Sequence, residues 1–305
     1  MNNIFRKLTT KPLWYYEREV VYKYDLLRTK RKLLKLKPLE SSTGGDFTLA
    51  CVTNIKDLEI ALWTLYSWIF FLEKKQYKTI LFIDGEITNE CLSITRTILP
   101  KITLISVKQF LNENKIPSFI TPNFIRDSPC GRKFAIINIL QRLSSVVFTD
   151  HDILTYNYPS DLIENLSKDK TSITIEDDIV YDNAILEFAN KIQLQHTPGF
   201  NSGVIGLPKG ILDDEITKDL LNYWDNNPTI NWFTEQTIHN ILFTFENASH
   251  LPKDKYVISK KRMFYFENDI DYENIHLRHF VNPVRHLMKI KGIPEFLEKI
   301  NYQIS

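Results

Sequence analysis

The sequence contains little cysteine and little glycine, and both shortages restrict the class of protein. Its 305 residues include only three cysteines, Cys51, Cys91 and Cys130, which stand far apart without a CxxC pair. An odd number of widely spaced cysteines is typical of a reduced compartment, so we expect free thiols rather than a disulfide framework. Nine glycines are too few for a fibrous repeat, and 43% apolar residues are too many for a disordered chain. The sequence therefore predicts a globular protein with its own hydrophobic core.

The sequence also lacks a hydrophobic run long enough to cross a membrane. Its longest apolar stretch, residues 61–72, is interrupted by Thr64 and Ser67, whereas a bilayer span needs about 20 residues. Residues 1–11 run into charge rather than into the apolar segment of a secretory signal. These features predict a soluble, cytoplasmic protein.

The net charge is small but unevenly distributed. The total is +1, whereas residues 1–40 carry 11 basic and four acidic side chains, or +7, which leaves −6 for the rest. The small total argues against a nucleic-acid partner. Within the basic segment, Trp14-Tyr15-Tyr16 precedes a run of basic residues at 28–37. This pattern predicts either peripheral contact of residues 1–40 with an anionic membrane or a helical arm, residues 17–36, packed on the body.

After the polar, glycine-containing segment 41–45, short apolar strands alternate with helical patterns. The predicted strands cover residues 47–53, 79–83, 102–107, 145–149, 172–175 and 204–207. The predicted helices cover residues 58–72, 88–99, 133–143, 160–166, 214–224 and 234–243. Asp57 is expected to cap the first helix, and Pro117, Pro122 and Pro129 predict a loop. The alternation is typical of βαβ units, so we expect an α/β protein.

An acidic motif, Asp150-His151-Asp152, follows the fourth predicted strand. In open α/β sheets, ligands bind beyond the carboxyl ends of the strands. Two carboxylates one residue apart can reach a single hard cation, and oxygen ligands suit Mg²⁺ or Mn²⁺. The motif therefore predicts a divalent-cation site, and the alternative is an ordinary acidic surface turn.

Lys133 opens the helix that precedes this strand, and topology places it at the same edge of the sheet. A crossover helix begins where the strands end, which also brings Thr53, Asn54 and Asp84 to this edge. A lysine at a helix N-terminus adds to the attraction of the helix for anions. A cation beside a carboxylate-bound metal suits a diphosphate ligand, and the alternative is a solvated surface lysine.

The strand and its Asp150-x-Asp152 ending resemble the DxD motif of GT-A-fold glycosyltransferases, which bind nucleotide-diphosphate sugars through Mn²⁺ or Mg²⁺. Further segments resemble, in the same order, motifs of the retaining glycogenin-like and bacterial galactosyltransferase-like group (family 8). These segments are Phe200-Asn201-Ser202-Gly203-Val204, Glu235-Gln236 with Asn240, and His279-Phe280 with Asn282 and Arg285. The resemblance covers residues 46–290. It implies a GT-A fold, a Rossmann-like mixed sheet flanked by helices, with a basic N-terminal helical extension.

The resemblance also implies three sets of functional residues. The metal ligands would be Asp150, Asp152 and His279. The donor-binding residues would be Thr53, Asn54, Lys133, Asp150, His151, Asn201, Ser202 and Arg285. The catalytic residues around the transferred sugar would be Gln236, Glu235 and Asp177, the last within an acidic cluster at 176–178.

The implied reaction is metal-dependent transfer of a sugar, expected to be a hexose, from a nucleotide-diphosphate sugar to an acceptor hydroxyl. UDP is the expected nucleotide, the acceptor would be a glycan, a lipid-linked group or another hydroxyl, and the anomeric configuration would be retained. A general-base role for Glu235 or Asp177 would instead give inversion. Residues 1–45 would form the extension, 46–152 the donor-binding half and 153–305 the acceptor-binding half with the C-terminal closure.

Two other functions remain open at this point. A phosphohydrolase of the haloacid dehalogenase type also carries a DxD after a strand, and there Asp150 would accept the phosphoryl group. A glycosyltransferase-like scaffold would bind a nucleotide sugar without turnover. The sequence departs from the group's pattern at Cys51-Val52-Thr53-Asn54, where acidic residues usually end the first strand, and at the bulky His151.

Overall fold

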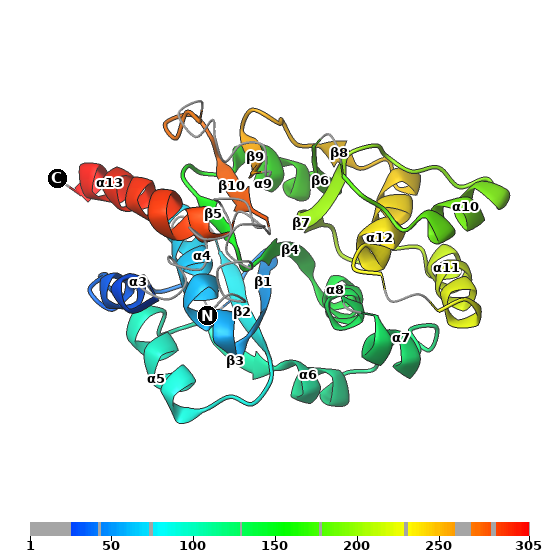
Figure 1. The fold of residues 1–305 in the computed structure, drawn as a ribbon, viewed down its shortest axis with the longest axis horizontal. Helices are drawn as coiled ribbons and strands as arrows, with labels where there is room; N and C mark the ends of the chain where they lie inside the picture. The colour runs from blue at the N-terminus through cyan, green and yellow to red at the C-terminus, as the bar shows by residue number, and fades with distance from the viewer. Residues whose placement is uncertain are drawn as a thin grey trace, which may run out of the picture.

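The computed structural model describes residues 26–41, 44–72, 76–128, 130–176, 179–228, 231–259, 270–281 and 285–304 (Figure 1). The strands of its main sheet are β1 (Phe47–Asn54), β2 (Tyr77–Asp84), β3 (Thr103–Ser106), β4 (Ser145–Asp150), β6 (Ser172–Ile175), β7 (Phe200–Leu207) and β8 (Ser249–His250). They follow the order β3-β2-β1-β4-β7-β6-β8. A smaller sheet consists of β5 (Ile153–Thr155), β10 (Leu277–Phe280) and β9 (Tyr256–Ser259).

Helices surround the main sheet. The described helices are α3 (Leu26–Leu33), α4 (Leu58–Phe71), α5 (Asn89–Ile98), α6 (Val107–Glu113), α7 (Pro122–Asp127), α8 (Gly131–Leu143), α9 (Ser160–Ser167), α10 (Asn183–Lys191), α11 (Asp214–Asn226), α12 (Thr234–Phe245) and α13 (Ile293–Ile304). In Figure 1, α3, α4, α5 and α13 lie on one side of the sheet, and α7, α8, α11 and α12 lie on the other.

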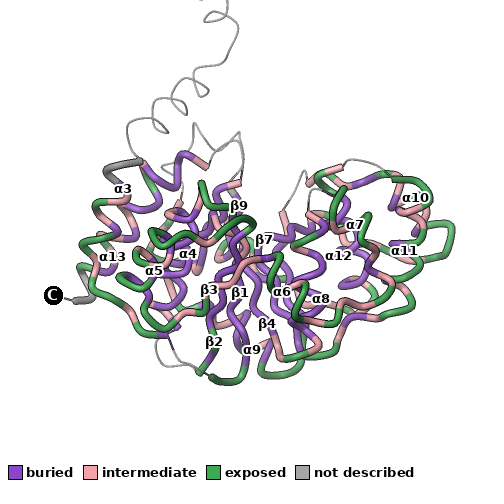
Figure 2. Tube along the Cα trace, turned by 90° about the horizontal axis from the view of Figure 1, so that it is seen from below, coloured by how far each residue is buried: buried purple, intermediate pink, exposed green. Residues whose placement is uncertain are grey.

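Two hydrophobic cores hold these layers together. One gathers around α4 and α13 and includes Trp63 and Phe296, whose rings lie 6.3 Å apart. The other gathers around α8 and α12 and includes Phe134 and Trp224. Figure 2 shows the buried residues running through the strands and along the inner sides of the helices. A sheet covered on both faces explains why its strands are continuous apolar runs in the sequence.

Strand pairing brings the predicted site residues to one edge of the main sheet. β1 pairs in parallel with β2 and with β4, in registers that place Asn54 opposite Asp84 and Val52 opposite Asp150. β7 runs antiparallel to β4, with Val204 opposite Thr149. The carboxyl ends of the parallel strands therefore meet the amino end of β7, where the predicted Asn201 lies.

The smaller sheet adds a residue from far along the chain. β10 pairs antiparallel with β5, and His279 lies opposite Ile153. The backbone N–H of Phe280 donates to the carbonyl oxygen of Asp152 over 2.9 Å. Because β5 begins directly after Asp152, this pairing delivers His279 to the DxD motif.

The predicted α/β class with a mixed sheet is confirmed, and the six predicted strands are present, five of them with shifted ends; β7, for example, begins at Phe200. The prediction of a simple loop between Pro117 and Pro129 is wrong, because α7 lies within it. Pro122 occupies the first turn of α7, where a missing N–H is tolerated, and Thr121 Oγ1 caps it by accepting from the N–H of Phe124.

The predicted cap by Asp57 is also wrong. A short 3₁₀ turn, Ile55–Asp57, precedes α4, and the side chain of Asn54 caps that turn instead. The Asp57 side chain makes no capping hydrogen bond to α4 and instead accepts from the amide of Asn54.

Only part of the predicted basic extension belongs to the described residues. α3 buries Leu33 and forms an ion pair between Lys30 and Glu90 of α5. Residues 1–25 lie outside the described residues, so the membrane contact stays a prediction. None of the described helices has the length and the apolar character that a membrane crossing requires.

Candidate metal and donor site

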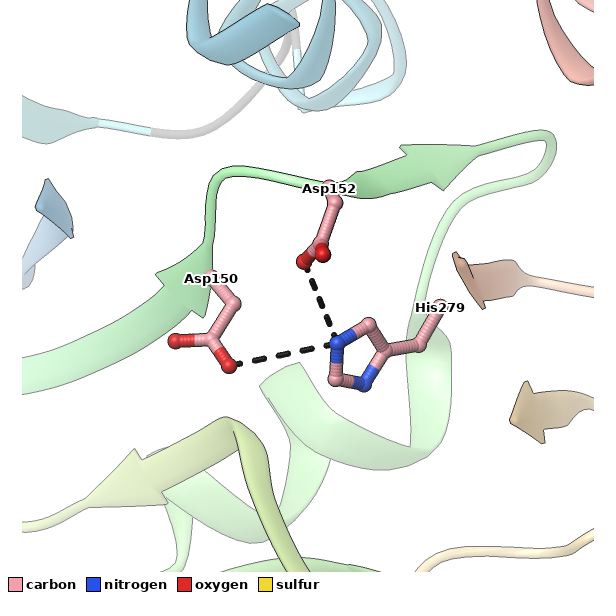
Figure 3. Close-up of side chains that lie close together, drawn as sticks. All are labelled: Asp150, Asp152 and His279. Carbon is pink, nitrogen blue, oxygen red and sulfur yellow. Dashed lines mark ion pairs between the residues drawn. The ribbon is translucent and has the colours of Figure 1, made fainter. Parts of the chain in front are cut away.

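The DxD motif turns at the end of β4 and presents two carboxylates to one point (Figure 3). Thr64 holds the turn, because its hydroxyl donates to the carbonyl oxygen of His151 over 2.6 Å and accepts from the N–H of Ile153 over 3.3 Å. The side chain of Asp150 is 29% exposed, whereas that of Asp152 is 3% exposed. The two predicted metal ligands therefore meet different environments.

His279 completes this group. Its Nε2 lies 3.2 Å from Asp152 Oδ1 and 3.9 Å from Asp150 Oδ2. One possible ligand atom from each of the three residues lies within 4.8 Å of the others. The structure thus brings the three predicted metal ligands together from two strand ends that are far apart in the sequence.

The orientation of His279 suits metal binding. Asn201 Oδ1 accepts from the N–H of Gly203 over 3.0 Å and lies 3.1 Å from His279 Nδ1. Because this oxygen is an acceptor, Nδ1 donates to it, and this bond directs Nε2 toward the carboxylates. A Cβ at position 203 would lie 2.3 Å from His279 Cε1, so only glycine lets the ring approach β7.

Two carboxylates and one imidazole nitrogen form a donor set that fits a small divalent cation. Carboxylates favour Mg²⁺ and Mn²⁺, and imidazole is also a ligand of first-row metals. Among the described residues, the group that could hold a metal ion combines His279 with the two aspartates and includes neither His276 nor His286. The three residues drawn in Figure 3 are thus a group that could hold a metal ion.

Lys133 projects from the first turn of α8 toward the first aspartate. Its Nζ lies 3.0 Å from Asp150 Oδ1, donates to the carbonyl oxygen and hydroxyl of Ser202 over 3.0 and 3.1 Å, and lies 3.7 Å from Glu235 Oε1. Burial alone would lower the pKa of Lys133, but the carboxylates of Asp150 and Glu235 raise it above its usual value. The amine is therefore a permanent cation in the site.

The start of α8 depends on one glycine. A Cβ at position 131 would lie 2.1 Å from the carbonyl oxygen of Phe124, so Gly131 lets α7 pack directly against the N-terminal end of α8. This packing fixes the helix turn from which Lys133 reaches the site.

Arg285 plays the corresponding part beside the second aspartate. Its Nε donates to Asp152 Oδ2 over 2.7 Å. Burial alone would raise the pKa of Asp152, but Arg285 and His279 hold it well below its usual value. Asp152 is thus ionised, and its two oxygens point to different partners.

Helix α12 supplies Glu235 and Gln236 from its first turn. Gln236 Oε1 accepts from the N–H of Ser202 over 3.2 Å and from Asn201 Nδ2 over 3.4 Å. Its amide donates to the carbonyl oxygen of Val180 over 3.2 Å. Gln236 therefore ties α12 to the start of β7 and to the segment that follows the acidic cluster. Asp177 itself lies outside the described residues, so its predicted role stays a prediction.

The remaining predicted donor-binding residues lie at the end of β1 and at the DxD turn. Thr53 is buried, whereas Asn54 is exposed and directs its Nδ2 to Asp57 Oδ2 over 2.8 Å. The Nε2 of His151 lies 3.7 Å from the same Asp57 oxygen. Asp57 is a residue of this edge that the sequence analysis assigned only to a helix cap; its spacing of three from Asn54 is the signal that was available.

An open cavity of about 1060 Å³ adjoins this edge beyond β2 and β3. Its lining includes Asp84 and Arg132, which form an ion pair, together with Lys108 and Gln109 of α6. Arg132 precedes Lys133 in α8, so the cavity borders the candidate site. This cavity was not expected from the sequence, because α6 and the helix within the proline segment were not predicted.

No family model and no curated protein matches the sequence. The fold is similar to that of solved glycosyltransferases. The apo form of mouse xyloside xylosyltransferase 1 aligns with a TM-score of 0.54 and 12% sequence identity, over 81% of this chain and 99% of that chain. The galactosyltransferase LgtC, in complex with donor and acceptor sugar analogues, aligns with a TM-score of 0.50 and 11% identity, over 84% of this chain and 95% of that chain. The chain therefore has the GT-A fold that the resemblance implied.

Proposed function

We propose that the chain is a metal-dependent glycosyltransferase that moves a sugar from a nucleoside-diphosphate sugar to an acceptor hydroxyl. The observation that carries the proposal is the convergence of Asp150, Asp152 and His279 at the ligand-binding edge of a GT-A sheet. Lys133 and Arg285 stand on either side of this group. Two cations around a carboxylate metal site suit a diphosphate better than a neutral ligand.

In this proposal, separate residues would bind the metal ion and the diphosphate of the donor. Asp150, Asp152 and His279 would hold Mn²⁺ or Mg²⁺, which when bound supplies positive charge opposite the departing diphosphate. Lys133 would bind a diphosphate oxygen with its ammonium group, and Arg285 would do so with its planar donor fork. Removing one such contact lowers the rate by about 10²–10³.

The polar cluster at the start of α12 would orient the transferred sugar. Gln236 and Asn201 hold each other in place, and the Ser202 hydroxyl donates to Glu235 Oε2 over 3.2 Å. The anionic Glu235 faces Lys133, so it balances the cation rather than standing as a free base. This arrangement favours front-face attack with retention, as in the family 8 group, with Asp177 as a further contact to the sugar.

The donor in this proposal is a UDP-hexose, and the nucleoside would bind at Thr53, Asn54 and His151. Residues 46–152 would form the donor-binding half and residues 153–305 the acceptor-binding half. The acceptor would be a glycan, a lipid-linked group or another hydroxyl compound, with residues 1–40 contacting an anionic membrane if the acceptor is lipid-linked.

A thermal-shift screen of nucleotide sugars with and without Mn²⁺ tests the proposal. A ligand that binds only the folded chain stabilises it by an amount that grows with the logarithm of ligand concentration over Kd, so the donor should give a metal-dependent increase in melting temperature. Turnover of that donor should release the nucleoside diphosphate, and NMR of the product should show the retained anomer. An inverted product would contradict retention alone.

Two results of the thermal-shift screen combined with activity assays would contradict sugar transfer. Steady phosphate release from simple phosphoesters, without any shift by nucleotide sugars, would indicate a phosphohydrolase. A metal-dependent shift without turnover in the presence of a panel of acceptors would indicate a binding scaffold.

A further inference from the structure

A fully buried histidine lies directly behind Glu235. His239 follows one turn later in α12, and its Nδ1 lies 2.8 Å from Glu235 Oε1. The other ring nitrogen, Nε2, has no hydrogen-bond partner among the described residues. Burying a ring nitrogen without a hydrogen-bond partner lowers the stability of the fold. Such a group in a folded protein calls for an explanation, and the bond to Glu235 offers one.

Two aromatic rings hold this imidazole in one plane. Phe134 of α8 stacks on one side with a centroid distance of 4.7 Å and an interplanar angle of 28°. Phe243 of α12 stacks at 5.1 Å and 5°. The ring therefore has little freedom to turn its Nδ1 away from Glu235.

The carboxylate determines which nitrogen carries the proton. Glu235 is held ionised, because burial, which would raise its pKa, is outweighed by Lys133, His239 and Ser202, which lower it. An ionised carboxylate only accepts, so His239 Nδ1 must donate. The opposite tautomer would place a nitrogen lone pair against the carboxylate oxygen.

Glu235 is the link between this histidine and the candidate site. Its Oε1 is shared by His239 Nδ1 and, at 3.7 Å, by Lys133 Nζ, whereas its Oε2 accepts from the Ser202 hydroxyl. A carboxylate fixed at both oxygens can rotate only if one of these bonds breaks. The bond from His239 is the one that originates farthest from the site.

We propose that His239 is a positioning residue, which acts through Glu235 to hold the Ser202 hydroxyl and the Lys133 ammonium in place for the donor. The proposal rests on the proposed glycosyltransferase function for its kinetic consequence, but its structural content is independent of the substrate. The hydrogen-bond partner of His239 is Glu235, which is neither a predicted metal ligand nor a predicted diphosphate-binding cation.

The structural content is tested by NMR of the full chain labelled with [¹⁵N]histidine. We expect His239 to be protonated at Nδ1, with ring signals that are lost in His239→Asn and shifted in Glu235→Gln. The His239→Asn spectrum distinguishes the signals of His239 from those of His279. A wild-type His239 protonated at Nε2 alone would overturn the proposal.

The kinetic consequence is tested with UDP-glucose and UDP-galactose as donors in the presence of Mn²⁺. His239→Leu keeps the bulk but removes the donor atom, and we expect kcat to fall about tenfold while the donor KM stays within about twofold. His239→Asn places an amide N–H where Nδ1 lies and should recover most of kcat. Equal loss of kcat in both variants would overturn the proposal.

Phe243→Leu is the matched control for packing around the ring. It removes one stacking partner but keeps the bond from His239 to Glu235, so it should lower the melting temperature without lowering kcat. A loss of kcat in Phe243→Leu as large as in His239→Leu would show that packing alone is responsible. If the wild type turns over no nucleotide sugar, the proposed function fails, and the NMR result still decides the role of His239.

Discussion

The candidate site has two sides that hold their carboxylates differently. On the α8 side, Lys133 reaches Asp150, which remains 29% exposed, and the same ammonium also contacts Ser202. On the β10 side, Asp152 is 3% exposed and lies between His279 and Arg285. The α8 side thus presents a cation near an accessible carboxylate, whereas the β10 side encloses its carboxylate completely.

This difference suits the two sides to different ligands of the proposed site. The oxygens of Asp152 are fixed by Arg285 and His279, so in the proposed function the β10 side would provide a preorganised ligand for a metal ion. The ammonium of Lys133 contacts Asp150 and Ser202, so in the proposed function the α8 side would provide the contact to the diphosphate. The following experiments alter one side at a time.

The largest effect is expected from Asp152→Asn on the β10 side. The amide is a much weaker metal ligand and leaves Arg285 beside a neutral group, so Mn²⁺-dependent turnover of the donor should fall by about 10²–10³. The measurement is release of nucleoside diphosphate. The control is Asp214→Asn, which removes an exposed ion pair with Arg142 and should keep near-normal turnover; equal activity of both variants would contradict the assignment of Asp152.

Stability should distinguish the two cations. Lys133→Met leaves the carboxylates of Asp150 and Glu235 without their shared cation, and we expect the free energy of unfolding to fall by about 3 kcal/mol. Arg285→Met removes a more exposed cation and leaves Asp152 with His279, so a loss of about 1–2 kcal/mol is expected. Urea unfolding of the metal-free protein measures both.

The surface variant Lys168→Met provides the baseline for this comparison, because its exposed pair with Glu164 should contribute less than about 1 kcal/mol. A larger loss in the free energy of unfolding for Arg285→Met than for Lys133→Met would contradict the expected difference between the two cations.

Gly203→Ala tests the orientation of His279. The added Cβ would lie 2.3 Å from His279 Cε1 and 2.8 Å from Asn201 Oδ1, so the ring must move away from its partner amide. We expect the affinity for Mn²⁺ to fall by about 10–100-fold. Isothermal titration with Mn²⁺ in the presence of UDP measures it, and Gly210→Ala, at a site with open space but a positive φ, controls for general strain. Unchanged Mn²⁺ affinity in Gly203→Ala would contradict the close approach.

The smallest effect concerns pH and is confined to the β10 side. His276 precedes β10, and its burial lowers its pKa below 6.5, although Asp161 opposes this. The folded chain therefore binds fewer protons at this position than the unfolded chain, so its contribution to stability falls as pH decreases below about 6.5. Urea unfolding between pH 5 and pH 7 should give a steeper pH dependence for the wild type than for His276→Gln; equal slopes would contradict this role of burial.

Much of the sheet was predictable, because β1, β2 and β4 are largely apolar runs that end at a polar residue. Asp150, at the end of β4, and Lys133, at the start of α8, follow from βαβ topology alone. The parallel registers then bring Asn54 and Asp84 to the same edge.

The rest of the site depends on tertiary pairing that local patterns do not encode. His279 reaches the DxD through the β5–β10 pairing, and its position was available only through the resemblance to family motifs. The bond between Arg285 and Asp152 was not predicted, because the resemblance implied that Arg285 binds the donor. The contact of His239 with Glu235 follows helical spacing, but whether that face of α12 is buried could not be determined from the sequence.

The most direct test of the metal site is electron spin echo spectroscopy of Mn²⁺ bound to the full chain with UDP. Coordination by His279 Nε2 predicts a ¹⁴N modulation from a single directly bound imidazole, which should disappear in His279→Gln while Mn²⁺ remains detectable at higher metal concentration. A wild-type complex that binds Mn²⁺ without any ¹⁴N modulation would contradict the site formed by Asp150, Asp152 and His279.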